Sequence, residues 1–215
     1  MSYLLRVSLP DVPGSLGRLA TAIGEAGGNI DAIEIVERHD GRAVDDVFLN
    51  SNASVLPDSI ISSCNSVEGV EVLWVSRYPS GSNLTRDLEA VEEMTASEED
   101  PVSTLLHLLP RVLVVDWAIK VGQNGTGIRV LDGSSAAPET LPDDFVWPQE
   151  FAVTSRVEVP DPWTDYVIAA APLSEAELLV IARRGGPEIL DSEVARLSHL
   201  AALAVSISSS RGGSN

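Results

Sequence analysis

The residues of this chain best suited to binding a small ligand form the segment Asp11 to Leu16, Asp-Val-Pro-Gly-Ser-Leu. Pro13 and Gly14 predict a tight turn, and Gly14 would let a ligand approach the backbone closely. Ser15 is suited to the N-cap position of a helix, where unpaired N–H groups and the positive end of the helix dipole favour a carboxylate or phosphate. The segment therefore predicts a ligand-binding loop at a helix N-terminus.

Two regular elements flank this loop. The run 3–9 is rich in strand formers, and Pro10 ends it because proline has no N–H to give to a sheet. From Ser15 onward, apolar residues recur every three or four positions, which predicts a helix that Gly27 and Gly28 end.

Further elements follow in a recognisable order. They are a strand over 29–37, a hairpin turn at Asp40-Gly41, a strand over 43–49, a helix begun by Pro57-Asp58 and a strand over 70–75. The order strand-helix-strand-strand-helix-strand is that of a ferredoxin-like sandwich.

This order resembles the ACT domain, a regulatory module that binds amino acids, over about residues 3–78. The residues that carry the resemblance are Asp11, Pro13, Gly14, Leu16, Leu19 and the turn Gly28-Asn29-Ile30. The resemblance implies that two copies pack together through their sheets or helices. It also implies that a small effector, usually an amino acid, lies between the first loop of one copy and the second strand of its neighbour.

Carried onto this chain, the resemblance implies ligand contacts from Asp11, Val12, Pro13, Gly14, Ser15, Leu16, Asn29 and Ile30. Backbone N–H groups near Gly14 and Ser15 would meet the ligand carboxylate. The Asn29 side chain, which both donates and accepts, would reach the ammonium or the carboxylate. Two simpler interpretations stay open: Pro13, Gly14 and Asn29 could serve only their turns, and Asp11 could hydrogen-bond the turn backbone.

Composition excludes several classes of function. The chain has 215 residues and a formal net charge of −18, and such an acidic surface repels phosphate backbones, so nucleic-acid binding is not expected. No apolar run approaches a membrane span, and a strand begins too early to leave room for a signal peptide. The single cysteine excludes an intramolecular disulfide, and we expect a cytoplasmic protein.

The remaining residues are numerous enough for a second domain. We expect an ACT-like domain over 1–79, a linker over 80–83, a second domain over 84–210 and a disordered tail over 211–215. The second domain is predicted to contain helices over 84–95 and 102–109, strands over 112–121 and 126–131 joined by an Asn124-Gly125 hairpin turn, a long loop over 133–150, strands over 151–159, 166–171 and 177–183, and a final helix from Asp191 or Ser192.

This second series resembles a GAF domain, a PAS-like sensor fold with an antiparallel sheet and helices. Asp116-Trp117-Ala118 and Arg183 to Pro187 carry the local likeness. The motif that accompanies cyclic-nucleotide binding is missing, so we expect a reduced GAF-like domain used for packing, dimerisation or an unknown small ligand. Four aromatic residues either line a pocket or form ordinary core: Trp117, Trp147, Phe151 and Trp163. The fold class expected for the whole chain is α+β.

No catalytic constellation is found in the sequence. Cys64 falls on the apolar stripe of a helix, and His39, His107 and His199 lack metal-ligand spacing. Asp45 and Asp46 are adjacent in a strand, so their side chains point to opposite faces. We therefore expect no enzymatic activity, no metal and no cofactor.

The function expected from these features is that of a non-enzymatic regulatory protein. It would be a homodimer that senses an amino acid bound at the interface of two ACT-like domains. The alternative is a scaffolding or regulatory subunit that binds a partner protein and needs no small molecule.

Overall fold

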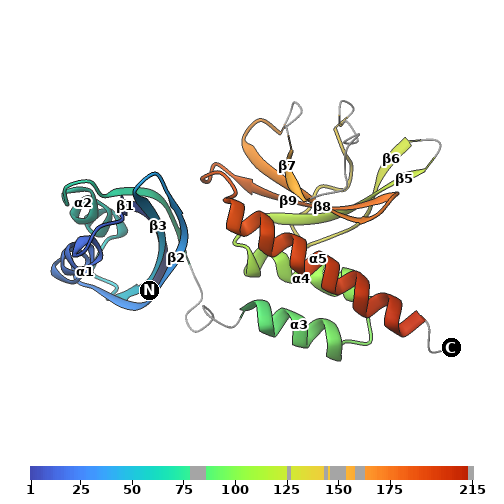
Figure 1. The fold of residues 1–215 in the computed structure, drawn as a ribbon, viewed down its shortest axis with the longest axis horizontal. Helices are drawn as coiled ribbons and strands as arrows, with labels where there is room; N and C mark the ends of the chain where they lie inside the picture. Colours follow the sequence, from blue (N-terminus) through green and yellow to red (C-terminus); the bar gives the residue numbers. More distant parts are fainter. Residues whose placement is uncertain (78–85, 125–126, 143–144, 146–153, 158–162, 213–215) are drawn as a thin grey trace. The chain divides into compact units, whose positions relative to one another are not determined.

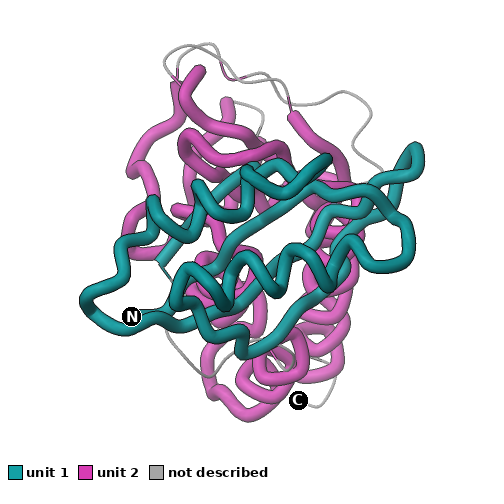
Figure 2. Tube along the Cα trace, turned by 90° about the vertical axis from the view of Figure 1, so that its left-hand side faces the viewer, with its two compact units in different colours: residues 1–83 teal, residues 84–215 magenta. Residues whose placement is uncertain are grey.

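The computed structural model describes residues 1–77, 86–124, 127–142, 145, 154–157 and 163–212 (Figure 1). Trp147 and Phe151, proposed above for a pocket, lie outside these residues, as do the expected linker 80–83 and residues 213–215. The chain forms two compact units, Met1–Asn83 and Leu84–Asn215, coloured separately in Figure 2.

Unit 1 is a four-stranded antiparallel sheet with two helices. Its elements are β1 (Ser2–Pro10), α1 (Ser15–Glu25), β2 (Gly28–His39), β3 (Arg42–Ser51), α2 (Pro57–Asn65) and β4 (Glu71–Arg77). The strand order is β2-β3-β1-β4, so β2 and β4 are the edges. Both helices cover the same face of the sheet (Figure 1). This confirms the predicted ferredoxin-like sandwich.

Alternation along β1 and β3 builds the core of unit 1. Every second residue points toward the helices, as expected for strands with one face covered by helices. The buried cluster contains Tyr3, Leu5, Val7 and Leu9 of β1, Ala43, Val47 and Leu49 of β3, and Leu19, Ile23, Ile60 and Cys64 of the two helices. Asp40 and Gly41, at φ 50° and 74°, form the tight β2–β3 turn that the sequence predicted.

Unit 2 is a five-stranded antiparallel sheet with three helices. Its elements are α3 (Arg86–Ala96), α4 (Pro101–Val112), β5 (Trp117–Asn124), β6 (Gly127–Gly133), β7 (Ser155–Val157), β8 (Tyr166–Ser174), β9 (Glu177–Arg184) and α5 (Asp191–Gly212). The strand order is β6-β5-β9-β8-β7. The order of helices, hairpin, long connection, strands and final helix is the one predicted, and the fold of the chain is α+β.

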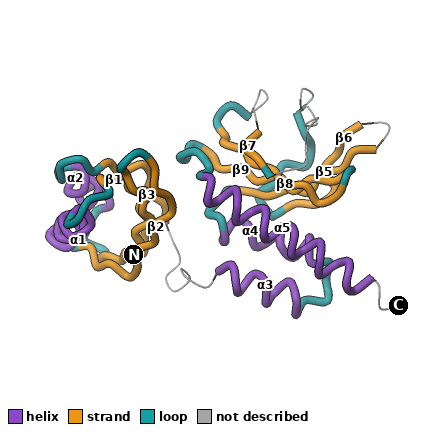
Figure 3. Tube along the Cα trace, in the orientation of Figure 1, coloured by secondary structure: helices purple, strands orange, loops and turns teal. Residues whose placement is uncertain are grey.

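The two faces of this sheet are packed differently. Figure 3 shows all three helices on one side of the sheet and the long connections on the other. The helix side contains Ala118, Ala169, Ala171, Leu179 and Ile181, which pack with apolar residues of α3, α4 and α5. The opposite side contains Trp117, Ile119, Val121, Trp163, Ile168 and Val180.

The predicted end of the second helix of unit 2 and the predicted start of the strand after it are wrong. The strand expected over 112–121 begins only at Trp117, because α4 continues through Pro110 to Val112 and Val114 then turns the chain at φ 52°. Pro110 removes one helix hydrogen bond but does not end α4, which continues for two more residues to Val112.

The end of α5 also differs from the expectation. The helix includes Arg211 and Gly212, which were expected in a disordered tail. Arg211 anchors this end because its guanidinium donates to the carbonyl oxygens of Met94 (3.0 Å), Thr95 (2.7 Å) and Glu99 (3.0 Å) around the end of α3.

Candidate functional site

The loop after β1 is held in a fixed conformation by its own backbone. The N–H of Asp11 donates to the carbonyl oxygen of Gly41 at 2.9 Å, which ties the loop to the β2–β3 turn. The N–H of Ser15 donates to the carbonyl oxygen of Val12 at 3.2 Å. Gly14 occupies the N-cap position of α1 at φ 88°, a conformation that strains any residue with a Cβ.

Ser15 does not act as the predicted N-cap. It is the first residue of α1, its side chain is buried, and no side chain caps this helix. Because the Ser15 N–H is used within the loop, the donors left in this region are those of Gly14, Leu16 and Gly17. In the part of the chain that the structure describes, these three N–H groups have no acceptor. They present unpaired donors at the positive end of the α1 dipole.

Charged side chains of Arg18, Asp11 and Arg38 lie at this end of unit 1. The Arg18 guanidinium donates to Oγ of Ser15 at 3.1 Å, and a Cβ added to Gly14 would lie 3.5 Å from it. On the other side, Oδ2 of Asp11 is 3.3 Å from Nε of Arg38, and both of these side chains are exposed. The loop and the first turn of α1 thus contain a cation, unpaired N–H groups and an exposed carboxylate.

The structure brings six of the eight predicted ligand residues together and places the other two far away. Asp11, Val12, Pro13, Gly14, Ser15 and Leu16 form the loop that follows Pro10, which pairs with Arg42 at the start of β3. Asn29 pairs with Asn50, eight residues further along β3, and Ile30 pairs with Leu49. At about 3.3 Å per residue the two groups are separated by roughly 26 Å. One copy therefore cannot contact a single amino acid with both.

Sequence reasoning missed two residues at this end, Arg18 and Arg38. Arg18 lies four residues after Gly14, one helical turn on, which was a readable signal. Arg38 reaches Asp11 only because the β2–β3 turn folds back toward the loop, and no local sequence pattern reports that.

Asp45 is a buried carboxyl group in the strand next to this end of unit 1. It alternates with Ala43 and Val47, so it lies on the helix-covered face, while Asp46 lies on the opposite face and accepts two 2.8 Å hydrogen bonds from Arg6. The expectation that the two carboxylates point apart is confirmed. Asp45 is 2% exposed and its Oδ1 has no hydrogen-bond partner. Burial raises its pKa; Arg38 opposes this, whereas Asp11 and Asp46 add to it.

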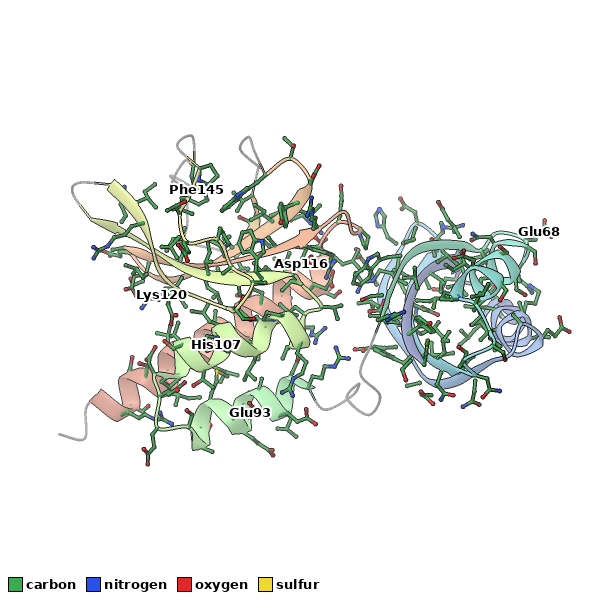
Figure 4. The ribbon with its side chains drawn as sticks, turned by 180° about the vertical axis from the view of Figure 1, so that it is seen from behind. Glu68, Glu93, His107, Asp116, Lys120 and Phe145 are labelled. Carbon is green, nitrogen blue, oxygen red and sulfur yellow. The ribbon has the colours of Figure 1, made fainter. Side chains whose placement is uncertain are left out.

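Unit 2 contains a pocket of about 590 Å³ on the face of the sheet opposite the helices. It is lined by Gln123, Gly127, Ile128, Arg129, Val130, Glu139, Thr140, Leu141, Pro142 and Phe145. Figure 4 shows Phe145 on this side of the sheet and His107 on the other, on α4. Trp117 and Trp163 do not line the pocket. They are buried beside it, with ring centroids 5.0 Å apart, as core residues.

The histidines and the cysteine are not gathered into a site. His39, His107 and His199 are exposed on separate elements. Cys64 is buried, which raises its pKa to about 11, so its thiol stays protonated at neutral pH. No three His, Cys, Asp or Glu side chains among the described residues are grouped as metal ligands. Nor is any helix in the described ranges long and apolar enough to cross a membrane.

Comparisons with known proteins bear on each unit. No curated protein sequence matches the chain. Among solved structures, the GAF domain of an Acinetobacter phosphoenolpyruvate-protein phosphotransferase is 13% identical with a TM-score of 0.46, over 63% of this chain and 98% of that one. The GAF domain of a putative sensor histidine kinase from Pseudomonas syringae pv. tomato is 14% identical with a TM-score of 0.42, over 60% and 86%. An unknown protein from Galdieria sulphuraria is 12% identical with a TM-score of 0.31, over 99% and 93%.

The family model of the ACT domain matches residues 3–58, which include the loop, α1 and both strands of the β2–β3 hairpin. Strand β4, beyond the matched residues, completes the sheet that the resemblance predicted. Residues 3–58 of the N-terminal unit are therefore similar to the ACT domain, and an α+β unit with a five-stranded antiparallel sheet follows this unit.

Proposed function

We propose that this chain is a non-enzymatic regulatory protein of the cytoplasm that binds an amino acid between the ACT domains of two copies. The observation that carries the proposal is the loop end of unit 1. There, unpaired N–H groups and Arg18 lie at the start of α1, and Asp11 supplies an exposed carboxylate at the start of the same loop. An α-amino acid has the complementary pair of charges, a carboxylate and an ammonium group, a few bonds apart.

Each charge of such a ligand has a suitable partner on the loop. The N–H groups of Gly14, Leu16 and Gly17 are donors at a helix N-terminus, which favours an anion, and Arg18 adds a full positive charge. Asp11 supplies the counter-charge for the ammonium group. The side chain of the ligand would then lie toward the second copy, so effector identity depends on both copies.

The separation of the two predicted groups supports a site shared between copies. Asn29 and Ile30 lie at the opposite end of the sheet from the loop, so they could serve only a neighbour's loop. They belong to β2, an edge strand with a free side for a second chain. A ligand that favours one geometry of this interface would shift the population of dimer states, and this shift is the signal.

A thermal-melting screen against the twenty amino acids tests the proposal. A ligand at one hundred times its Kd should stabilise the folded protein by about 2.7 kcal/mol, which raises Tm measurably. Gly14→Asp places a like charge and a strained side chain in the carboxylate site, and it should abolish the shift. Thr21→Asp adds the same charge to an exposed position of α1 and should leave the shift intact.

Two other outcomes would point elsewhere. A shift that survives Gly14→Asp and is lost in Arg129→Ala would place the ligand in the unit 2 pocket, whose polar lining includes both Arg129 and Glu139. If none of the twenty amino acids changes the Tm of the protein, the amino-acid proposal is wrong. The scaffolding function would then be favoured, since the loop and its neighbouring edge strand also expose the apolar side chains of Val12 and Ile35, at 53% and 46%.

A further inference from the structure

Asp45 is a buried carboxyl group placed at the rim of the unit 1 core. Its cross-strand neighbours are Val7 on β1 and Ile35 on β2. Ile35 is 46% exposed, so Asp45 lies one strand in from an open edge rather than deep in the core. An unpaired buried carboxyl oxygen is costly in such surroundings, and it is conspicuous within a few residues of the ligand loop.

The register places Asp45 within reach of Arg38. Arg38 is directly opposite Ala43, and Asp45 is two residues further along β3 on the same face. Diagonal neighbours of this kind lie about 7–8 Å apart between backbones, which a long side chain can span. Nε of the same arginine lies 3.3 Å from Oδ2 of Asp11, so one guanidinium lies within reach of two carboxyl groups.

Few other titratable groups face Asp45. The residues of α1 that face the sheet are Ser15, Leu19, Ala22 and Ile23, and those of α2 are Ile60 and the neutral Cys64. On β3 itself, Asp46 points to the other face, where it pairs with Arg6. The charges that act on Asp45 are therefore chiefly those of Arg38 and Asp11, the same two groups that raise or lower its pKa most after burial.

We propose that Arg38 is shared between Asp11 and Asp45, so that protonation of Asp45 decides how free the Asp11 carboxylate is to bind a ligand's ammonium group. The inference rests on the proposed function, whose ammonium partner is Asp11. When Asp45 is protonated, Arg38 pairs with Asp11 alone and occupies it. When Asp45 loses its proton, it competes for Arg38, and Asp11 becomes available to another cation.

This arrangement makes Asp45 a positioning residue that links the loop to pH. Because an ammonium group on Asp11 releases Arg38 to Asp45, ligand binding favours the ionised form of Asp45 and releases its proton. By linkage, the affinity for an ammonium ligand rises as pH rises through the titration of Asp45.

The experiment is an NMR titration of the full chain without ligand, which follows the side-chain carboxyl carbons of Asp11 and Asp45 and the Nε resonance of Arg38. We expect Arg38 and Asp11 to show a step at the midpoint of Asp45, above its ordinary value of 3.8. Asp45→Asn should abolish that step in both. Asp31→Asn removes the same charge from an exposed position beside Asn50, at the far end of the sheet, and should leave the step in place.

A second variant, Arg38→Gln, tests the inference even if Asp45→Asn alters the fold. Arg38→Gln removes the shared cation and should raise the midpoint of Asp45 further, because the positive charge of Arg38 lowers the pKa of Asp45. If the Arg38 and Asp11 resonances ignore the Asp45 midpoint, or keep their step in Asp45→Asn, the inference is wrong. Since no ligand is present, this result is independent of the melting screen, and either proposal can fail while the other stands.

Discussion

Arg18 supplies the loop with a positive charge that its backbone alone lacks. Its guanidinium lies against Ser15 and close to Gly14, while the rest of the side chain is exposed. Arg18→Ala should weaken binding of the amino acid found in the melting screen by about 10- to 150-fold, since a hydrogen bond to a charged group contributes roughly 1.5–3 kcal/mol. Isothermal calorimetry measures this, and Arg18→Lys should lose less. An unchanged Kd in Arg18→Ala would remove Arg18 from the site.

Asp45 imposes a cost on stability that depends on pH. Burial raises its pKa in the folded chain above the unfolded value of 3.8, so between these two values the folded state binds more protons. The stability of the wild-type chain therefore falls as pH rises through this window, and the penalty is complete above the folded pKa. Asp45→Asn, which does not titrate, should be more stable by about 1–2 kcal/mol at neutral pH and lose this advantage near pH 3. Urea unfolding at several pH values measures the difference, and an equal difference at all pH values would contradict it.

The residues of the site could be predicted from sequence only in part. The turn at Pro13 and Gly14 was predicted from residue type, and glycine accepts the positive φ that this turn has at position 14. Arg38 and Asp45 could not be recognised, because their proximity depends on the register of β2 against β3. A bulge between Ile35 and Glu37 sets that register, and the sequence pattern of β2 does not reveal it.

Among the elements, the start of α5 depends on a buried ion pair. Arg183 at the end of β9 is 1% exposed, and its guanidinium is 2.7 Å from Oε1 of Glu193. It also donates to the carbonyl oxygens of Leu113 and Val114 in the turn after α4, at 2.9 and 3.1 Å. This one side chain connects β9, the α4–β5 turn and α5.

Glu193→Ala should therefore destabilise unit 2 by about 3–5 kcal/mol, because it leaves a buried guanidinium without its carboxylate. Glu193 also accepts a 2.8 Å hydrogen bond from the N–H of Leu190, so the beginning of α5 should fray as well. Asp165→Ala is the matched control: its pair with Arg184 is exposed and 3.6 Å long, and loss of this acidic side chain should change stability by less than about 0.5 kcal/mol. Chemical denaturation compares the two. Equal effects would show that Arg183 and Glu193 contribute no more than a surface pair.

The strand start predicted at Val112 in unit 2 was wrong for a physical reason. Val112 to Val115 is an apolar, largely β-branched run that reads as the start of a strand. In the fold, Val112, Leu113 and Val115 are buried at the end of α4, where packing against the sheet and α5 outweighs local preference. Helix–strand ambiguity of this kind is expected for short apolar runs that are buried on several sides.

At the scale of the whole molecule, the proposed site exists only in an assembly. The loop of one copy and Asn29 of the same copy lie roughly 26 Å apart. A chain that stays monomeric in solution would therefore have half of each predicted contact set and no complete site. Sedimentation measurements should show a dimer at the concentrations used for the melting screen, and a ligand that binds across the interface should strengthen it.

A mixing experiment tests the shared site directly. Gly14→Asp disables the loop, and Asn29→Leu, at an exposed edge position, disables the group that serves the neighbour's loop. Neither variant alone should bind the effector. In a two-fold dimer with random exchange, half of the molecules are mixed, and each mixed dimer pairs the intact loop of one chain with the intact Asn29 of the other. About one quarter of all sites should then recover, measured as ligand bound per chain by calorimetry. Recovery requires that the two groups come from different chains, so either no recovery after confirmed exchange or full binding by Asn29→Leu alone would contradict the interface proposed here.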